Sequence, residues 1–194
     1  MNAAEHFICS SRLWRYFTRR HLLPWLLYGT RLGDHLLEIG AGYGAATSYL
    51  TTHVSRVTSL EYDRNSTLKL KSQINGIAAA ARGDAANLPF TSQTFSSALA
   101  ILVLHHLKST QLQDQMFAEA FRVLRPGGVF IACEIHDSWF HRVGHIRSTF
   151  TPLAPGSAPP RLCAAGFSEI ALDVHKGAFR ITAIRPNAGS RCEQ

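Results

Sequence analysis

Apolar runs of strand length alternate with helix-compatible stretches along most of this chain. The runs that predict strands cover residues 35–39, 56–61, 77–81, 97–103 and 129–134. The stretches that predict helices between them cover residues 45–52, 64–75 and 110–124. Strands that are joined through helices run parallel, so the pattern predicts an α/β fold around a parallel sheet.

Two further features of the pattern refine this sheet. Residues 98–103 are almost continuously apolar, which is typical of a central strand covered on both faces. Runs at 167–174 and 178–184 are separated by only three residues, His175-Lys176-Gly177, and this short connection predicts an antiparallel hairpin.

Residues 10–28 predict an amphipathic helix before the first strand, which Pro24 would kink. Its apolar positions are Leu13, Trp14, Phe17, Trp25 and Leu26, and its basic positions are Arg12, Arg15 and Arg19. We expect a packed apolar face, with Trp14, Phe17 and Trp25 as docking residues, beneath a solvated basic face. The alternatives are contact with an anionic membrane surface or with an acidic substrate.

The pattern weakens between residues 136 and 160, where four prolines indicate a partly irregular surface insertion on the substrate side. His141 and His145 have the i, i+4 spacing of helical metal ligands, with His136 and Asp137 nearby. No third ligand is determined by spacing, so we predict no metal site.

Composition and charge set the remaining bounds. The chain has 194 residues, 46% of them hydrophobic, which predicts one domain over residues 1–194 with a single core. The four cysteines form no CxxC pair, and no apolar stretch reaches the length of a membrane span, so we expect reduced thiols and a cytoplasmic protein. The formal net charge of +7 favours anionic partners of unspecified kind.

The first strand leads into a loop with glycines at positions 40, 42 and 44, where a ligand can approach the backbone closely. Ligands of open α/β sheets lie beyond the carboxyl ends of the strands, so this loop should converge with Glu61, Asp84 and residues 103–106. A carboxylate at Glu61 can accept hydrogen bonds from a ribose diol, and Asp84 can accept one from an adenine amine. These acids predict a nucleoside site.

Five blocks in order carry a family resemblance that extends from about residue 36 to 185. They are LEIGAGYG (37–44), LEYD (60–63), GDAANLPF (83–90), LVLHHL (102–107) and RVLRPGG (122–128). With them the chain resembles a small class I S-adenosylmethionine-dependent methyltransferase of the ubiquinone-biosynthesis type. The resemblance implies a Rossmann-like, doubly wound sheet of seven strands, mostly parallel with the last strand antiparallel.

The resemblance also implies a set of residues around S-adenosyl-L-methionine. Glu38 would lie near the amino-acid end of the cofactor, Glu61 would hold the ribose hydroxyls, and Asp84 would bind the adenine amine. The full set of implied cofactor residues is Glu38, Gly40, Ala41, Gly42, Tyr43, Gly44, Glu61, Tyr62, Asp84, Ala85, Ile101 and Leu102. Tyr43 either covers the cofactor or faces solvent.

Other readings of the glycine loop remain open. Residues 40–45 also satisfy GxGxxG/A, and Glu61 stands near the acidic spacing of a nicotinamide dinucleotide site, so an NAD-dependent oxidoreductase is one alternative. A glycine turn of purely structural purpose is another. A third is a protein that binds S-adenosylmethionine without catalysis. Glu38, Asp84 and the LRPGG turn favour the methyltransferase.

The expected reaction is methyl transfer to a small-molecule acceptor, anionic or lipid-like. His105 and His106 are expected at the end of the fourth strand, with side chains on opposite sides, and one of them would serve as a base or as a polar packing residue. Cys133 is expected to be a buried apolar residue rather than a nucleophile. The chain lacks an Asn/Asp-Pro-Pro-aromatic run and a Pro-Cys nucleophile, so we do not expect a nucleic acid substrate.

Overall fold

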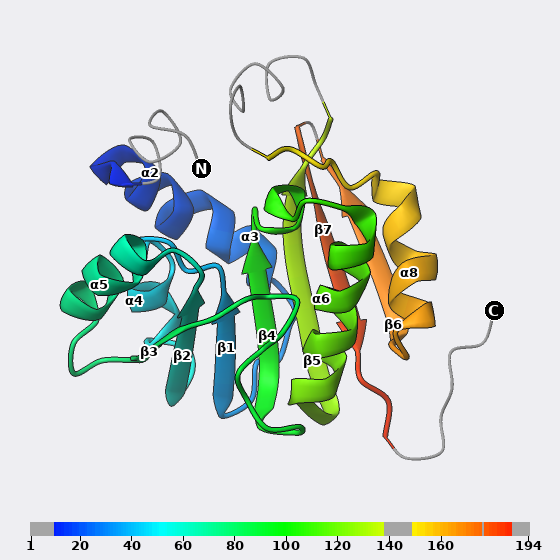
Figure 1. Cartoon of the computed structure of the whole chain (residues 1–194), viewed down its shortest axis with the longest axis horizontal. Helices are drawn as coiled ribbons and strands as arrows, with labels where there is room; N and C mark the ends of the chain where they lie inside the picture. Colours follow the sequence, from blue (N-terminus) through cyan, green and yellow to red (C-terminus); the bar gives the residue numbers. More distant parts are fainter. Residues whose placement is uncertain (1–9, 138–148, 176, 188–194) are drawn as a thin grey trace.

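The computed structural model describes residues 10–137, 149–175 and 177–187. At its centre lies a seven-stranded sheet with strand order β3-β2-β1-β4-β5-β7-β6 (Figure 1). The strands are β1 (His35–Ile39), β2 (Arg56–Glu61), β3 (Ala79–Arg82), β4 (Phe95–Ile101), β5 (Leu124–Ile135), β6 (Ser168–Val174) and β7 (Ala178–Ile184). β1 to β5 run parallel, whereas β7 runs antiparallel to both β5 and β6. The predicted Rossmann-like sheet and its terminal hairpin are confirmed.

Helices cover both faces of this sheet. The α-helices are α2 (Arg12–Phe17), α3 (Leu23–Leu27), α4 (Thr47–Leu50), α5 (Arg64–Gln73), α6 (Thr110–Val123) and α8 (Ala158–Ala164). A π-helical turn η1 (Thr18–Leu22) joins α2 to α3, and the 3₁₀ turns are η2 (Leu104–His106) and η3 (Pro155–Ser157). α6 and α8 pack on one face, and α3 and α4 pack on the other (Figure 1).

Strand β4 shows why the middle of the sequence is so apolar. Ala98 and Ala100 belong to the core cluster beneath α6 and α8, whereas Leu99 belongs to the cluster beneath α3 and α4. All three are fully buried. Because successive side chains of a strand point to opposite faces, a strand between two helical layers carries apolar residues on both faces.

The boundaries of three strands differ by two or more residues from the predicted ones, and the largest difference is in β5, which begins at Leu124 rather than at residue 129. β3 begins at Ala79 rather than at residue 77, because Ile77 is half exposed and does not join the sheet. β4 spans Phe95–Ile101, two residues earlier than predicted. Phe95 is buried between the rings of His35 and Phe90, and Leu102 leaves the strand with φ +57°.

The N-terminal helix docks differently from the sequence prediction. Its predicted kink is the π-helical turn that precedes Pro24, in which the amide of Leu23 donates to the carbonyl of Thr18. Leu23 and Leu26 are fully buried, whereas α2 has no buried residue. The expectation that Trp14 and Phe17 dock this helix is therefore wrong, whereas Trp25 of α3 packs against the core as expected.

An arginine from the distant β7 strand closes the end of this helix. The guanidinium of Arg180 donates to the carbonyls of Trp25 and Tyr28, at 3.2 and 2.9 Å, and to the hydroxyl of Thr30 at 2.9 Å. Carbonyls at the end of a helix have no partner within it, so these bonds cap α3 and attach it to the sheet.

The predicted insertion over residues 136–160 is only partly an irregular surface segment. Leu153 and Ala158 are buried in the core, and α8 begins within the predicted range. His141 and His145 lie outside the described residues.

Cys133 is a free buried thiol, but Cys163 is disulfide-bonded, so the expectation of four reduced cysteines is wrong. No helix in the described ranges is both long and apolar enough to span a bilayer.

Candidate functional site

The loop after β1 is shaped by three glycines in the left-handed region. Gly40, Gly42 and Gly44 have φ values of +73°, +55° and +75°. A Cβ atom at Gly40 would lie 2.4 Å from Cγ2 of Val103, so the loop packs directly against the segment that follows β4. At Gly42 an added Cβ would meet nothing within 4 Å. Gly40 therefore serves packing, whereas Gly42 borders open space that a ligand can use.

Glu61, at the end of β2, holds this loop through its side chain. Its Oε2 accepts a hydrogen bond from the amide of Gly42 at 2.8 Å, and its Oε1 accepts one from the amide of Asp63 at 2.9 Å. Each carboxylate oxygen has a second lone pair, so Glu61 can still accept from a ribose hydroxyl. Glu61, the residue expected to hold the ribose, thus lies beside the open position of the loop.

Glu38 lies near the end of β1, just before the glycine loop, and is buried. Its Oε2 accepts hydrogen bonds from the hydroxyls of Thr47 and Ser59, both at 2.6 Å. Burial raises the pKa of Glu38 to about 7, which the two hydroxyls oppose and the nearby charge of Glu61 reinforces. A carboxyl group with this pKa changes charge near neutral pH.

The remaining cofactor residues of the sequence prediction surround the same edge. Asp84 is exposed after β3, and its Oδ1 accepts a hydrogen bond from the amide of Ala86 at 2.9 Å. Ala85 is half-buried, and the ring of Tyr62 is 69% exposed. Tyr43 is buried with the ammonium of Lys69 5.2 Å from its ring centroid, so the alternative that it faces solvent is wrong.

The end of β4 turns sharply, and this turn changes the arrangement of the two histidines. Leu102 has φ +57°, which is uncommon for a residue other than glycine, and its amide donates to the carbonyl of Cys133 at 2.9 Å. His105 and His106 then lie in η2, not on the strand, with ring centroids 4.2 Å apart. The expectation of side chains on opposite sides of a strand is therefore wrong, because alternation ends where the chain becomes helical.

A buried carboxylate from β5 organises this turn. Glu134 accepts a hydrogen bond from the amide of Leu104 at 2.7 Å, and its other oxygen lies 2.6 Å from Nδ1 of His105. Glu134 and His105 are both buried, whereas His106 is half-buried. The structure thus gives the two histidines different environments that the sequence alone could not distinguish.

The same turn is braced from α6 and from residues 149–154. The side-chain Nε2 of Gln113 donates to the carbonyls of Leu104 and Thr151, at 3.0 and 2.8 Å. The amide of Thr151 donates to the carbonyl of His105 at 2.8 Å. Gln113 in turn accepts from Arg161 of α8 at 3.0 Å. The turn after β4 is therefore held directly by the side chain of Gln113 and by the backbone of Thr151, while Arg161 binds Gln113.

Four residues of this region were not predicted from the sequence: Glu134, Thr47, Ser59 and Gln113. One sequence feature could have indicated Glu134: it is an acidic residue at the carboxyl end of an otherwise apolar strand, where ligands of α/β sheets bind. Thr47 and Ser59 carry no signal beyond their hydroxyls, because 9 and 21 residues of chain separate them from the carboxylate that they bind.

Other chemistry at this edge is limited by burial. Burial, reinforced by the charge of Glu134, raises the pKa of the Cys133 thiol to about 12, so this cysteine carries no thiolate at neutral pH. In the part of the chain that the structure describes, no three His, Cys, Asp or Glu side chains form a group suited to a metal ion.

Comparisons with known proteins show which family the sequence resembles. The sequence profile of a family described as a methyltransferase domain matches residues 37–132. A probable S-adenosylmethionine-dependent methyltransferase of Mycolicibacterium smegmatis is 30% identical over 141 residues, which cover 72% of this chain and 51% of that protein. A phthiotriol/phenolphthiotriol dimycocerosates methyltransferase of Mycobacterium ulcerans is 33% identical over 110 residues, covering 55% of this chain and 39% of that protein.

A solved structure extends the likeness in fold. A Pyrococcus horikoshii protein superposes with a TM-score of 0.79 at 16% identity, covering 95% of this chain and 99% of that chain. In sequence, by contrast, this chain spans only about half or less of the length of the two curated relatives.

Proposed function

Residues 37–132 belong to the methyltransferase-domain family, in its class I S-adenosylmethionine-dependent form, and we propose that this chain transfers a methyl group to a small lipid-like acceptor. The observation that carries the proposal is the open position at Gly42 beside the Glu61 carboxylate. A backbone without a side chain next to a carboxylate at a strand end is suited to a ribose.

The residues at this edge fit S-adenosylmethionine in kind and in position. Glu61 would hold the ribose hydroxyls, Asp84 would accept from the adenine amine, and the exposed ring of Tyr62 is available to cover the adenosine. The cofactor supplies an electrophilic methyl group, so the protein needs no covalent nucleophile. What this chain contributes is the position of the acceptor and the removal of its proton where it has one.

Glu38 has two roles in this proposal. Its carboxylate, on β1, accepts from Thr47, at the start of α4, and from Ser59, on β2, and so joins β1 to the helix that follows the glycine loop and to the neighbouring strand. With a pKa of about 7, it is also able to carry the negative charge that an amino group of the cofactor would favour.

We assign the proton transfer to His106 and a positioning role to His105. His105 is buried, and its Nδ1 is directed at Glu134, which determines the orientation of the ring. His106 is half-buried and lies against that oriented ring. A base has to reach the acceptor, and of the two imidazoles His106 is the more accessible.

The acceptor class is supported by the name of one relative. The Mycobacterium ulcerans relative is named for dimycocerosate acceptors, which are lipid-like. We extend a lipid-like acceptor to this chain. The net charge of +7 favours an acceptor that also carries an anionic group.

Calorimetry with the purified chain tests the cofactor assignment. We expect binding of S-adenosylmethionine and S-adenosylhomocysteine, and a loss of about tenfold in affinity for Glu61→Gln, because one charged hydrogen-bond acceptor is removed. Affinity for NADH with none for S-adenosylhomocysteine would establish the oxidoreductase alternative instead. Binding without S-adenosylhomocysteine release across a panel of lipid-like acceptors would establish a binding protein.

The pH dependence of turnover tests the two histidine roles. In His106→Gln we expect kcat to fall about 100-fold and to lose the pH dependence that ionisation of the base imposes. In His105→Asn that titration should persist with a lower kcat, because the base is present but poorly positioned. If His106→Gln retains the wild-type profile, His106 is not the base.

A further inference from the structure

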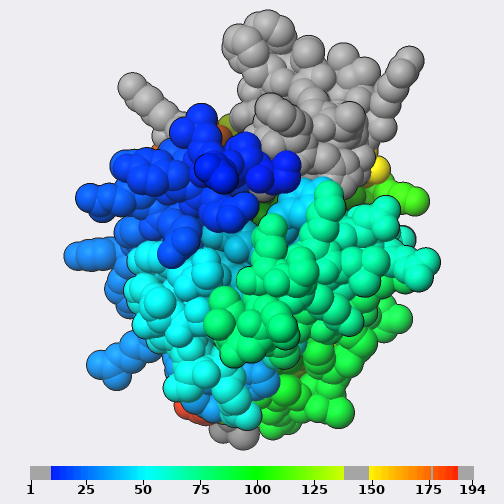
Figure 2. Space-filling model, turned by 90° about the vertical axis from the view of Figure 1, so that its left-hand side faces the viewer, coloured from blue at the N-terminus to red at the C-terminus, as the bar shows by residue number. Residues whose placement is uncertain are grey.

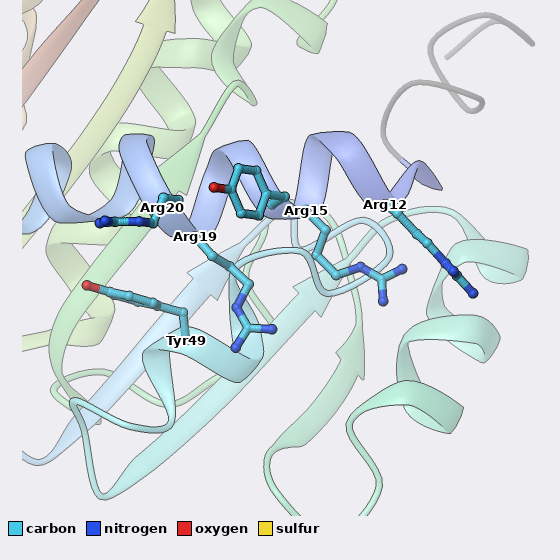
Figure 3. Close-up of a pocket in the computed structure, with 6 residues that line it drawn as sticks. Arg12, Arg15, Arg19, Arg20 and Tyr49 are labelled. Carbon is cyan, nitrogen blue, oxygen red and sulfur yellow. The ribbon is translucent and has the colours of Figure 1, made fainter.

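Four arginines of the N-terminal helix line a groove that the methyl-transfer site does not use. The groove has a volume of about 460 Å³ and is lined by Arg12, Arg15, Tyr16, Arg19 and Arg20 together with Tyr49 of α4. Figure 3 shows Arg12, Arg15 and Arg19 extending from the helix on the side where α4 and its Tyr49 lie. None of these residues belongs to the proposed cofactor set.

The charge of this groove has no counterpart in the described part of the chain. No carboxylate within the described residues pairs with Arg12, Arg15, Arg19 or Arg20, whereas Arg56, Arg122, Arg125 and Arg161 each contact one. Guanidinium groups brought together without an acid repel one another, and an anion between them relieves that repulsion. Guanidinium groups bind phosphate with charge-assisted hydrogen bonds, and tyrosine hydroxyls can add further donors.

Apolar side chains beside the arginines narrow the choice of anion. Leu13 is 77% exposed and Phe17 is 46% exposed, although both lie on the same helix as the four arginines. The helix thus combines a basic side with unburied leucine and phenylalanine, which is the arrangement of helices that lie in a membrane interface. A nucleic acid or a free phosphate would satisfy the arginines but would leave the leucine in water.

The position of the helix is compatible with such a surface. Figure 1 shows α2 on the side of the molecule toward which β1, β2 and β4 point. In the space-filling view the same helix forms a ridge of its own, next to the surface of α4 and α5 (Figure 2). The docking end of the helix is α3, where Leu23 and Leu26 are buried, so α2 can contact a surface without loss of core packing.

We propose that α2 and η1 form a docking surface for anionic phospholipid membranes, with lipid phosphate groups in the arginine groove and Leu13 and Phe17 in the interface. This surface brings the carboxyl edge of the sheet close to lipid. It goes beyond the proposed methyl transfer and does not depend on it.

Co-sedimentation of the full chain with vesicles tests the proposal. We expect binding to vesicles of equal parts phosphatidylglycerol and phosphatidylcholine, little binding to phosphatidylcholine alone, and weakening by salt. Arg15→Glu/Arg19→Glu should weaken binding by about 30-fold or more. The matched control is Arg64→Glu/Lys71→Glu on α5, which changes the net charge equally and should bind like the wild type.

A second pair of variants examines the apolar contribution. Leu13→Ser should weaken vesicle binding by about fivefold, whereas Leu68→Ser, at a leucine that is 58% exposed on α5, should leave it unchanged. Should the double glutamate variant fail to fold by circular dichroism, Arg15→Gln/Arg19→Gln adds no acid to the helix and is expected to lose about tenfold.

Three outcomes would overturn the proposal. They are equal binding to charged and neutral vesicles, equal loss in the α5 control, and groove-dependent binding of inorganic phosphate or of transfer RNA without vesicle binding. Since no measurement in this set involves methyl transfer, failure here leaves the proposed function unaffected, and absence of methyl transfer leaves this proposal unaffected.

Discussion

The two halves of the candidate site are built by different means. The loop after β1 depends on what is missing from its residues, because Gly42 leaves space and Gly40 permits contact with Val103. The turn after β4 depends on side chains, because Glu134, His105 and Gln113 hold its backbone in place. The first half is shaped to receive a ligand, whereas the second is already filled and can only present a group to one.

This difference extends to the buried carboxylates. Glu38 receives two hydroxyl hydrogen bonds on one oxygen and has its pKa raised to about 7 by burial. Glu134 receives a backbone amide on one oxygen and an imidazole on the other. Both acids are buried, but only Glu134 has a partner that can carry a compensating positive charge.

The largest effect on stability is expected from a substitution in the turn after β4. His105→Ala removes one member of a buried pair and leaves Glu134 without its imidazole, which should lower the free energy of unfolding by about 3 to 5 kcal/mol. For a chain of this length that corresponds to a fall of about 10 °C in Tm. Calorimetric unfolding measures it, with His53→Ala at an exposed histidine as the control. An equal Tm for both variants would contradict the assigned role of the pair.

A somewhat smaller effect follows from the buried Glu38. Because the folded state raises its pKa from 4.5 to about 7, the folded protein binds the proton more tightly than the unfolded chain between these values. This group therefore destabilises the fold progressively as pH rises from about 4.5 to about 7, by about 3 kcal/mol in all.

Denaturant unfolding of Glu38→Gln checks this sign. As pH rises through that window, the free energy of unfolding of the variant should increase relative to that of the wild type. Glu169→Gln, at an exposed position, is the control and should show no such shift. A wild-type profile that the Glu38 substitution leaves unchanged would contradict the assignment.

The loop half is tested by separating binding from stability. Gly42→Ala and Gly76→Ala each place a side chain at positive φ with nothing within 4 Å, so each should cost about 1 kcal/mol of stability. Only Gly42→Ala should weaken S-adenosylhomocysteine binding, by about 30-fold, because its methyl group enters the ligand space. Calorimetric titration of both variants measures the contrast, and equal affinities would place the ligand elsewhere.

The smallest effect is expected at the exposed rim of the site. Asp84→Asn removes the charge of one acceptor at a solvated position and should weaken S-adenosylhomocysteine binding by about fivefold. Asp173→Asn, on the far β6 strand, is the matched control. A larger loss for Asp173 than for Asp84 would show that the adenine amine is not bound at the end of β3.

The loop after β1 could be predicted from the sequence more fully than the turn after β4. The loop could be predicted because it is continuous in sequence, and its glycines and the acids at the strand ends have recognisable spacing. The placement of His105 and His106 was wrong, since nothing in LVLHHL indicates that Leu102 reverses its φ and starts a 3₁₀ turn. That reversal depends on partners 30 or more residues away, among them Cys133 and Glu134.

The sequence by itself determined the strand pattern, the parallel sheet with its terminal hairpin and the position of the glycine loop after the first strand, because hydrophobic periodicity and glycine positions are local properties of the chain. Only the tertiary structure decided which carboxylates are buried, which histidine is accessible and which arginines of the first helix meet in a groove. Those properties depend on contacts between segments far apart in the chain, and burial and charge are set by what surrounds a side chain rather than by its neighbours in sequence.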